Sequence, residues 1–212
     1  MTVALASLAP APSVRAALQE ARAHGRCALI PYITLGYPSL EASLALLEGL
    51  EESGVDAVEI GVPFSDPVAD GPTIQHTIDR ALAQGVTLRR ILAALRPGGT
   101  ARVLFSYCNP LLAHGLEDLP AALRRVGVGA VLITDLVPEE AGSWTRIAAS
   151  GGIETCWLVA STSTEARLVQ AAEASSGFVY CVATLGVTGS RSSLDETAEA
   201  TVGRLRRHSD CL

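Results

Sequence analysis

Six short apolar runs recur along the 212-residue chain, and each is followed by a stretch with helical periodicity. The apolar runs span residues 27–35, 55–62, 101–108, 129–136, 154–160 and 177–183. They are nearly continuous in hydrophobicity, a pattern typical of parallel strands that are covered on both faces. The hydrophobic pattern therefore predicts six parallel strands.

The amphipathic stretches between these runs carry the start and stop signals of helices. Ser39 is a plausible N-cap for the first stretch, and Gly54 is expected at its C-cap. Pro72 lies near the first turn of the second stretch, and Gly85 stops it. The predicted helices fall within residues 39–54, 71–85, 87–99, 137–152, 163–177 and 192–208.

This alternation predicts one α/β domain over residues 1–212, built from about six β-α units. Two architectures fit the pattern, an open doubly wound sheet and a (β/α)8 barrel. The first βα turn has no G-x-G-x-x-G sequence, which weakens the dinucleotide-binding form of the open sheet.

Composition narrows the function classes. The chain is 49% hydrophobic with a formal net charge of −6, so a general nucleic-acid surface is disfavoured. No apolar run reaches membrane-spanning length, and residues 1–18 are interpreted as a short leader into a helix. The five cysteines are odd in number and widely spaced, without C-x-x-C, which favours a reduced, cytoplasmic protein.

The most unusual stretch is "EIGVPFSDPVADGP", residues 59–72. Glu59 lies near the carboxyl end of the second predicted strand, the end that faces the active site in parallel α/β folds. Desolvation there would raise the pKa of Glu59 toward the range useful for proton transfer. Asp70 lies in the following loop and is expected to stay ionised. Two carboxylates in different environments can take different catalytic roles.

Each of these acidic residues also has a structural interpretation. Asp66 before Pro67 is expected to start a turn. Asp70 could be the N-cap of the helix at Pro72, and Glu59 could pair with an arginine.

Two absences limit the chemistry that can be expected. The chain contains no lysine, which excludes catalysis through a lysine imine. The four histidines are scattered without ligand-like spacing, so we expect no metal site.

Five segments together carry a family resemblance. The chain resembles the tryptophan synthase alpha chain in "IPYITLGYP", "DAVEIGVPFSDPVADGPTIQ", "YCNPLL", "DLVPEE" and "GVTGSR", in that order. The resemblance implies a (β/α)8 barrel and cleavage of indole-3-glycerol phosphate to indole and glyceraldehyde 3-phosphate. It places the family's catalytic glutamate on Glu59 and its catalytic aspartate on Asp70. Glu59 would then shuttle both protons, while Asp70 would accept the indole N–H.

The resemblance also assigns substrate contacts. Tyr32 and Tyr107 occupy positions that line the family's indole pocket, although each alone could be a core or rim residue. Tyr180 matches a tyrosine close to the reacting side chain. Thr188 and Gly189 match the family's lid, with Thr188 contacting the catalytic aspartate and Gly189 near the phosphate.

The resemblance further implies a partner, a beta chain that carries pyridoxal phosphate in an α2β2 assembly. The alpha chain itself is expected to need no cofactor. Asp66, Pro67, Asn109 and Pro110 match the segments that face that partner.

The C-terminal part departs from the family pattern. We expect the chain to lack the last two β-α units, and with them the two glycine-rich phosphate loops. Activity could then be impaired, and an alternative function is a chain that only docks on the beta chain. A third interpretation, another phosphate-binding barrel isomerase, is disfavoured by the missing lysine and by the pairing of Glu59 with Asp70. Two further departures, Thr134 and Ser161, stand where the family usually has proline.

Overall fold

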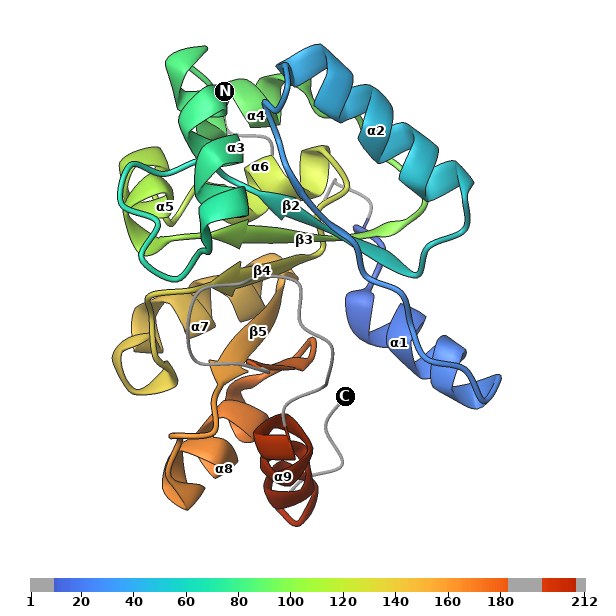
Figure 1. Cartoon of the computed structure of the whole chain (residues 1–212), viewed down its shortest axis with the longest axis vertical. Coiled ribbons are helices and arrows are strands. Elements are labelled where there is room, and N and C mark those ends of the chain that lie inside the picture. The colour runs from blue at the N-terminus through green and yellow to red at the C-terminus, as the bar shows by residue number, and fades with distance from the viewer. Residues whose placement is uncertain (1–9, 183–195, 209–212) are drawn as a thin grey trace.

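The computed structural model describes residues 10–182 and 196–208, and within them six parallel strands form one curled sheet (Figure 1). The strands are β1 (Tyr32–Thr34), β2 (Ala57–Gly61), β3 (Ala101–Ser106), β4 (Ala130–Ile133), β5 (Glu154–Val159) and β6 (Val179–Cys181). Each strand pairs with the next one in chain order, from β1 to β6. Sequential order is the order of a (β/α) barrel, whereas a doubly wound sheet reverses its strand order.

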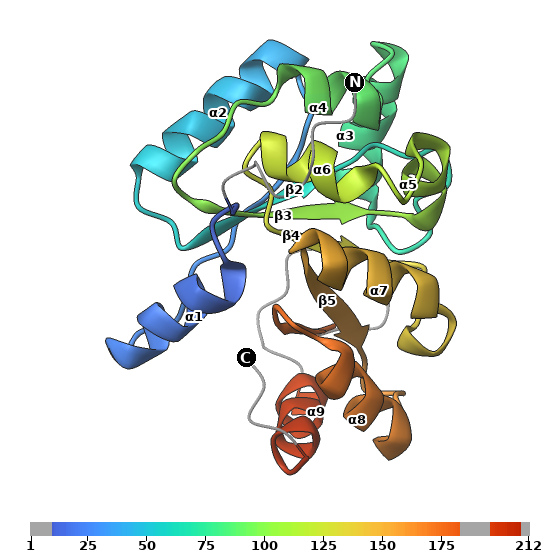
Figure 2. The same cartoon turned by 180° about the vertical axis from the view of Figure 1, so that it is seen from behind.

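The described helices alternate with these strands. They are α1 (Val14–Ala23), α2 (Leu40–Glu52), α3 (Pro72–Ala83), α4 (Leu88–Ala94), α5 (Cys108–His114), α6 (Leu119–Arg125), η2 (Pro138–Glu140), α7 (Gly142–Gly151), α8 (Glu165–Ala174) and α9 (Glu196–Arg206). Seen from behind, α6 and α7 lie along the outer side of β3 to β5 (Figure 2). In the described chain the outer layer of helices therefore covers the convex side of the curled sheet.

The predicted ends of α2 and the predicted start of α3 agree with the structure to within a residue, whereas α4 and α8 end earlier than predicted, at Ala94 and Ala174. The Ser39 hydroxyl accepts a hydrogen bond from the Ala42 amide at 3.1 Å, which confirms the N-cap of α2. Ser53 is the C-cap of α2, and Gly54 follows it with φ +79°, a left-handed conformation that favours glycine. Pro72 is the first residue of α3.

Two helices were missed by sequence reasoning, and one predicted helix is divided. Both α5 and α6 are seven residues long and lie between β3 and β4. The Cys108 amide of α5 donates to Asp135 Oδ1 at 2.7 Å, so this N-terminus is capped from a distant loop. The predicted helix at 137–152 forms the separate turn η2 and then α7, with Ala141 between them.

Alternate strand residues build two separate apolar clusters. Val58 and Ile60 of β2 belong to a large cluster packed under the outer helices. Ala57, on the opposite face, belongs to a second cluster on the inner face of the sheet, together with Val103 and Leu132. Because side chains alternate across a strand, Glu59 also faces inward, next to this second cluster.

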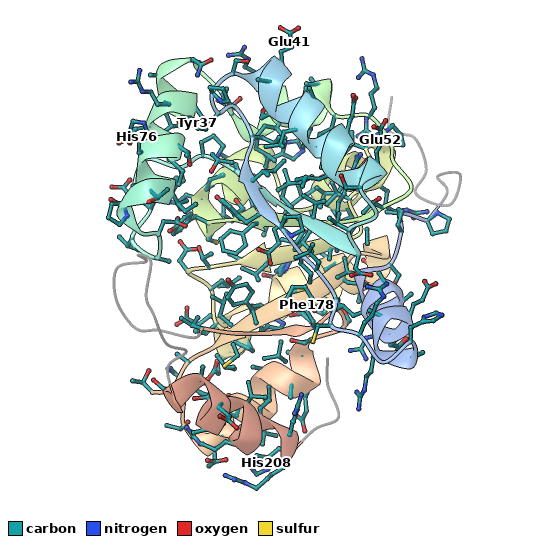
Figure 3. All side chains as sticks on the ribbon, turned by 45° about the vertical axis from the view of Figure 1, so that its right-hand side comes forward. Tyr37, Glu41, Glu52, His76, Phe178 and His208 are labelled. Atoms are coloured by element: carbon teal, nitrogen blue, oxygen red, sulfur yellow. The ribbon has the colours of Figure 1, made fainter. Side chains whose placement is uncertain are left out.

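Helix α1 covers the amino end of the inner face. Val14 packs in the same inner cluster as Phe178, and Figure 3 labels Phe178 beside α1. Glu154, the first residue of β5, accepts hydrogen bonds from the Val14 amide at 2.8 Å and the Ser13 hydroxyl at 2.5 Å. The inner face is therefore closed by apolar groups at its amino end, and its polar groups lie toward the carboxyl ends of the strands.

Among the described residues, no helix is long and apolar enough to cross a membrane.

Candidate active site

Glu59 is a buried carboxyl group on the inner face of the sheet. It lies in the middle of β2, level with Tyr32 of β1 and Val103 of β3, and is 5% exposed. Burial raises the pKa of Glu59 to about 7, because removal from water disfavours the charged form. A carboxyl group with such a pKa can both give and take a proton near neutral pH.

Asp70 lies at the end of the loop that joins β2 to α3 and is half-buried. The Tyr107 hydroxyl donates a hydrogen bond to Asp70 Oδ2 at 2.7 Å and accepts one from the Ala69 amide at 3.0 Å. Burial raises the pKa of Asp70, and the hydrogen bond from Tyr107 opposes that shift. The loop thus presents an acidic group that is held by a neighbouring element.

An aromatic wall lies on the same inner face. Tyr32 contacts Phe105 edge-on with ring centroids 5.3 Å apart, and Phe105 contacts Tyr180 at 6.3 Å. These three rings come from β1, β3 and β6. Gly61 makes room for the first of them, since a Cβ atom at Gly61 would stand 2.1 Å from the Tyr32 hydroxyl. The wall matches the flat, apolar character of an aromatic ligand.

The charges of Glu59 and Asp70 both affect the pKa values of two phenols, those of Tyr32 and Tyr180. Burial is the main cause that raises the pKa of Tyr32, and the negative charges of Asp70 and Glu59 raise it further. Burial and the same two charges also raise the pKa of Tyr180. Since electrostatic effects of this kind require proximity, both carboxyl groups lie in the neighbourhood of Tyr32 and Tyr180.

The structure bears on the non-catalytic interpretations of these three acidic residues, as an N-cap, an ion-pair partner and the start of a turn. Gly71, not Asp70, is the N-cap of α3, so the N-cap interpretation of Asp70 is wrong. Glu59 forms no ion pair with any described arginine, so that interpretation gains no support. Asp66 does begin a turn, in which its carbonyl accepts from the Val68 amide at 2.9 Å.

The residues expected to face a partner lie on exposed segments. Asp66 is exposed at the tip of the β2–α3 loop, beside the partly buried Pro67 and Val68, whose side chain is 85% exposed. Asn109 is exposed and Pro110 is partly exposed, both in the first turn of α5. Tyr107 joins the two segments through the hydrogen bonds described above.

Not every predicted residue can be placed. Thr188 and Gly189 lie outside the described residues. Thr134 and Ser161, which stand where the family usually has proline, both make backbone hydrogen bonds in the structure. The Thr134 amide donates to the Ser106 carbonyl at 2.9 Å, and the Ser161 carbonyl accepts from Arg204 of α9 at 3.3 Å.

Sequence reasoning missed two aromatic residues of the site. Phe105 forms the centre of the aromatic wall, and Phe64 packs against Tyr107 with ring centroids 5.1 Å apart. Phe105 could have been found from strand alternation, because it follows the inward-facing Val103 by two residues. Phe64 had no such signal, since it lies in a loop without a regular period.

Another aromatic pair lies outside this wall. Tyr37 contacts His76 of α3 edge-on, with centroids 6.0 Å apart (Figure 3). Tyr37 is 36% exposed, and its ring contact is with His76 and not with a ring of the aromatic wall. It therefore offers a comparison for the tyrosines of the site.

The fold, together with a buried carboxyl group of raised pKa and an aromatic wall on the inner face of the sheet, indicates a (β/α)-barrel type of enzyme. The tryptophan synthase alpha chain family profile matches residues 18–211. The chain belongs to the tryptophan synthase alpha chain family. This is a family of carbon–carbon lyases in tryptophan biosynthesis that cleave indole-3-glycerol phosphate.

Individual relatives agree with this assignment. The alpha chain of Nocardia farcinica is 44% identical over 193 residues, which cover 90% of this chain and 73% of the relative. Among solved structures, tryptophan synthase of Mycobacterium tuberculosis superposes with a TM-score of 0.88 at 40% identity, covering 95% of this chain and 78% of that one. The tryptophan synthase α2β2 complex of Pyrococcus furiosus gives 0.80 at 37% identity, covering 87% and 75%.

Proposed function

We propose that Glu59 and Asp70 carry the cleavage of indole-3-glycerol phosphate to indole and glyceraldehyde 3-phosphate. The observation that supports this most directly is the placement of the two groups: Glu59 is buried on the inner face, level with Tyr32 of the aromatic wall, and Asp70 is held at the end of the following loop by Tyr107. Two acidic groups that converge beside an aromatic wall suit a substrate whose reacting part is an indole ring.

Glu59 supplies the proton transfers. In its neutral form it gives a proton to indole C3, and the ring becomes positively charged. The resulting carboxylate then accepts the proton of the side-chain hydroxyl, the bond between C3 and the hydroxyl-bearing carbon breaks, and its electron pair returns to the ring. The aldehyde leaves, and Glu59 is neutral again. A pKa of about 7 leaves both protonation states accessible for this cycle.

Asp70 stabilises the charge that appears on the ring. Its carboxylate accepts the indole N–H and so favours the intermediate protonated at C3. A fixed carboxylate of this kind acts mainly on the transition state, where the positive charge is greatest. The two carboxyl groups thus have different roles because one is buried on a strand and the other lies on a loop.

No cofactor is required for this reaction, because the protonated indole ring itself receives the electron pair. This fits a chain without lysine, which could not form an imine. The family resemblance implies that pyridoxal phosphate belongs to the beta chain. We place the protein in the cytoplasm, where the cysteines at 27, 108, 156 and 181 would remain the free thiols seen in the structure.

The proposed partner is a tryptophan synthase beta chain in an α2β2 assembly, as in the Pyrococcus furiosus complex. The loop tip at Asp66 and Pro67 and the start of α5 at Asn109 and Pro110 would form the contact. Both segments are solvent-exposed, and Tyr107 links them.

Replacement of Glu59 by glutamine tests the catalytic proposal. We expect Glu59→Gln to lower kcat for indole release by about a hundredfold or more, because glutamine cannot transfer a proton. Glu52→Gln, on an exposed residue at the end of α2, is the matched control and should keep the activity. Equal activity of Glu59→Gln and wild type would refute the role of Glu59.

The alternative function, a chain that only docks on the beta chain, is favoured by the 85% exposure of Val68 at the loop tip. Binding of the beta chain with no indole release by the wild type, alone or in the complex, would support docking alone. Indole release that Glu59→Gln removes without loss of binding supports the enzyme.

A further inference from the structure

Tyr107 occupies the junction of three parts of the site. It follows β3 directly, it is the N-cap residue of α5, and its side chain reaches the loop between β2 and α3. The residue is only 2% exposed, although its hydroxyl group is polar. A buried hydroxyl needs hydrogen-bond partners, and here the Ala69 amide and the Asp70 carboxylate come from the loop between β2 and α3, while the Thr134 side chain is a further partner.

We infer that Tyr107 is a positioning residue for Asp70: its hydroxyl holds the carboxylate by Oδ2 and thereby turns the remaining oxygen toward the indole N–H. The inference rests on the proposed function and deepens it, since the resemblance assigned to Tyr107 only a place in the wall of the indole pocket. The role now assigned belongs to the hydroxyl, not to the ring.

The hydrogen bonds of the hydroxyl fix the direction in which it acts. The Ala69 amide donates to it at 3.0 Å, and its own proton goes to Asp70 Oδ2 at 2.7 Å. The Tyr107 hydroxyl oxygen therefore binds the backbone of Ala69 and the side chain of the next residue, Asp70. Among the described residues, Asp70 Oδ1 accepts no hydrogen bond, so this oxygen is the one available to a ligand.

The ring of Tyr107 holds the same loop at its other end. It packs against Phe64, which lies near the start of the loop, with an interplanar angle of 32°. The loop is therefore attached to one residue at both ends, through an aromatic contact and a pair of hydrogen bonds. Small displacements of a catalytic group can be costly, and this double attachment limits them for Asp70.

The hydroxyl also affects the ionisation of Asp70. Burial raises the pKa of this carboxyl group, and the hydrogen bond from Tyr107 lowers it again. The other titratable groups that face Asp70 are the phenols of Tyr32 and Tyr180, from β1 and β6. Both are neutral near pH 7, so the Tyr107 hydroxyl is the group described here that favours the carboxylate form.

Tyr107→Phe removes the hydroxyl and keeps the ring. We expect kcat to fall about ten- to a hundredfold, the loss typical of a hydrogen bond to a charged group, with KM nearly unchanged. The acid limb of the pH profile of kcat should move to higher pH, because Asp70 needs more alkaline conditions to ionise. Tyr37→Phe, on the exposed tyrosine outside the wall, is the control and should leave the profile in place.

A residue that only lines the pocket would give a different result. Loss of such a residue would raise KM. Tyr107→Leu, which removes the ring as well, would then lower the activity much more than Tyr107→Phe. Unchanged kcat and an unchanged acid limb in Tyr107→Phe overturn the positioning role, even if Tyr107→Leu is impaired.

A second measurement does not depend on turnover. Carboxyl carbon NMR on the full chain labelled at aspartate, with Asp70 assigned from Asp70→Asn, gives the pKa of Asp70 directly. We expect a higher value in Tyr107→Phe than in the wild type, and equal values would overturn the inference. If the wild type releases no indole while this shift is observed, the proposed function fails and the positioning contact stands.

Discussion

At the residue scale, the chemistry of the site depends on where each carboxyl group is attached. Glu59 is fixed on a strand that is buried on both faces, and for that reason water cannot stabilise its charge. Asp70 lies eleven residues further on, in a loop that keeps partial contact with solvent. The same functional group thus acquires two different tendencies to ionise within one short segment.

The raised pKa of Glu59 has a consequence for stability. A carboxyl group with a usual pKa of 4.5 and a folded value of about 7 stabilises the fold below pH 4.5, where it is neutral in both states. This contribution is lost as the pH rises from 4.5 to 7, by about 3 kcal/mol in total.

Glu59→Gln should therefore gain stability relative to the wild type as the pH rises. The difference in free energy of unfolding between the two proteins is expected to grow by about 3 kcal/mol from pH 4.5 to pH 8. Urea denaturation at a series of pH values measures it, with Glu52→Gln as the exposed control. A difference that stays constant over this range would contradict the burial of a titrating Glu59.

At the element scale, a buried ion pair joins α2 to β3. Arg102 of β3 is 3% exposed and donates to Glu51 of α2 at 2.6 Å and to the Val126 carbonyl at 2.9 Å. Gly98 lies against this pair, since a Cβ atom there would stand 2.5 Å from the Arg102 guanidinium. Arg102 also donates to the Arg96 carbonyl at 2.5 Å, so its charge is satisfied from three segments at the amino end of the sheet.

Removal of the carboxylate should be costly, because it leaves a buried charge without its partner. We expect Glu51→Ala to lower the free energy of unfolding by about 3 kcal/mol. Glu139→Ala is the control, because Glu139 pairs at 3.4 Å with an Arg167 side chain that is 60% exposed. That change should cost well under about 1 kcal/mol. Similar losses for the two variants in thermal or urea unfolding would contradict this account.

Elements far apart in the sequence also support one another at the amino end. Helix α1 lacks acidic residues in its first turn, and Glu154 of β5 accepts hydrogen bonds from the Val14 and Arg15 amides in their place. Negative charge at this position satisfies free amides and complements the helix dipole.

Glu154→Ala should therefore loosen α1 before the rest of the molecule. A loss of about 1–2 kcal/mol is expected, the range found for helix N-caps. Hydrogen exchange should accelerate at the amides of α1 more than at those of β3. Glu173→Ala, on an exposed residue of α8, is the matched control. Uniform acceleration across the sheet would argue against a local role for Glu154.

At the scale of the whole molecule, the six described strands form an incomplete ring. In the described residues, β1 and β6 each pair with a strand on one side only. The 212 residues match 73% of the Nocardia farcinica relative. In barrels of this type, a phosphate site is commonly formed by the loops after strands seven and eight.

Weak binding of the phosphate group is therefore expected for a polypeptide made of these 212 residues. We expect the 212-residue chain to bind indole-3-glycerol phosphate about tenfold or more weakly than the Nocardia farcinica alpha chain. Indole itself should bind to both with similar affinity, because the aromatic wall is present. Titration calorimetry with the two ligands makes the comparison. Equal affinity of both proteins for the phosphate ester would contradict this expectation.

The sequence by itself determined the six strands, their parallel arrangement and the placement of Glu59 on the second strand with Asp70 in the loop that follows. Continuous apolar runs and helix caps such as Ser39 are local signals, and residue alternation places Glu59 on the inner face. Only the tertiary structure decided between the barrel and the open sheet, because strand order depends on which strands pair. It alone showed the Tyr107–Asp70 contact and the capping of α5 by Asp135, since these bonds join segments at separations of 37 and 27 residues. No local pattern encodes such bonds, whose partners are chosen by the packing of the whole sheet.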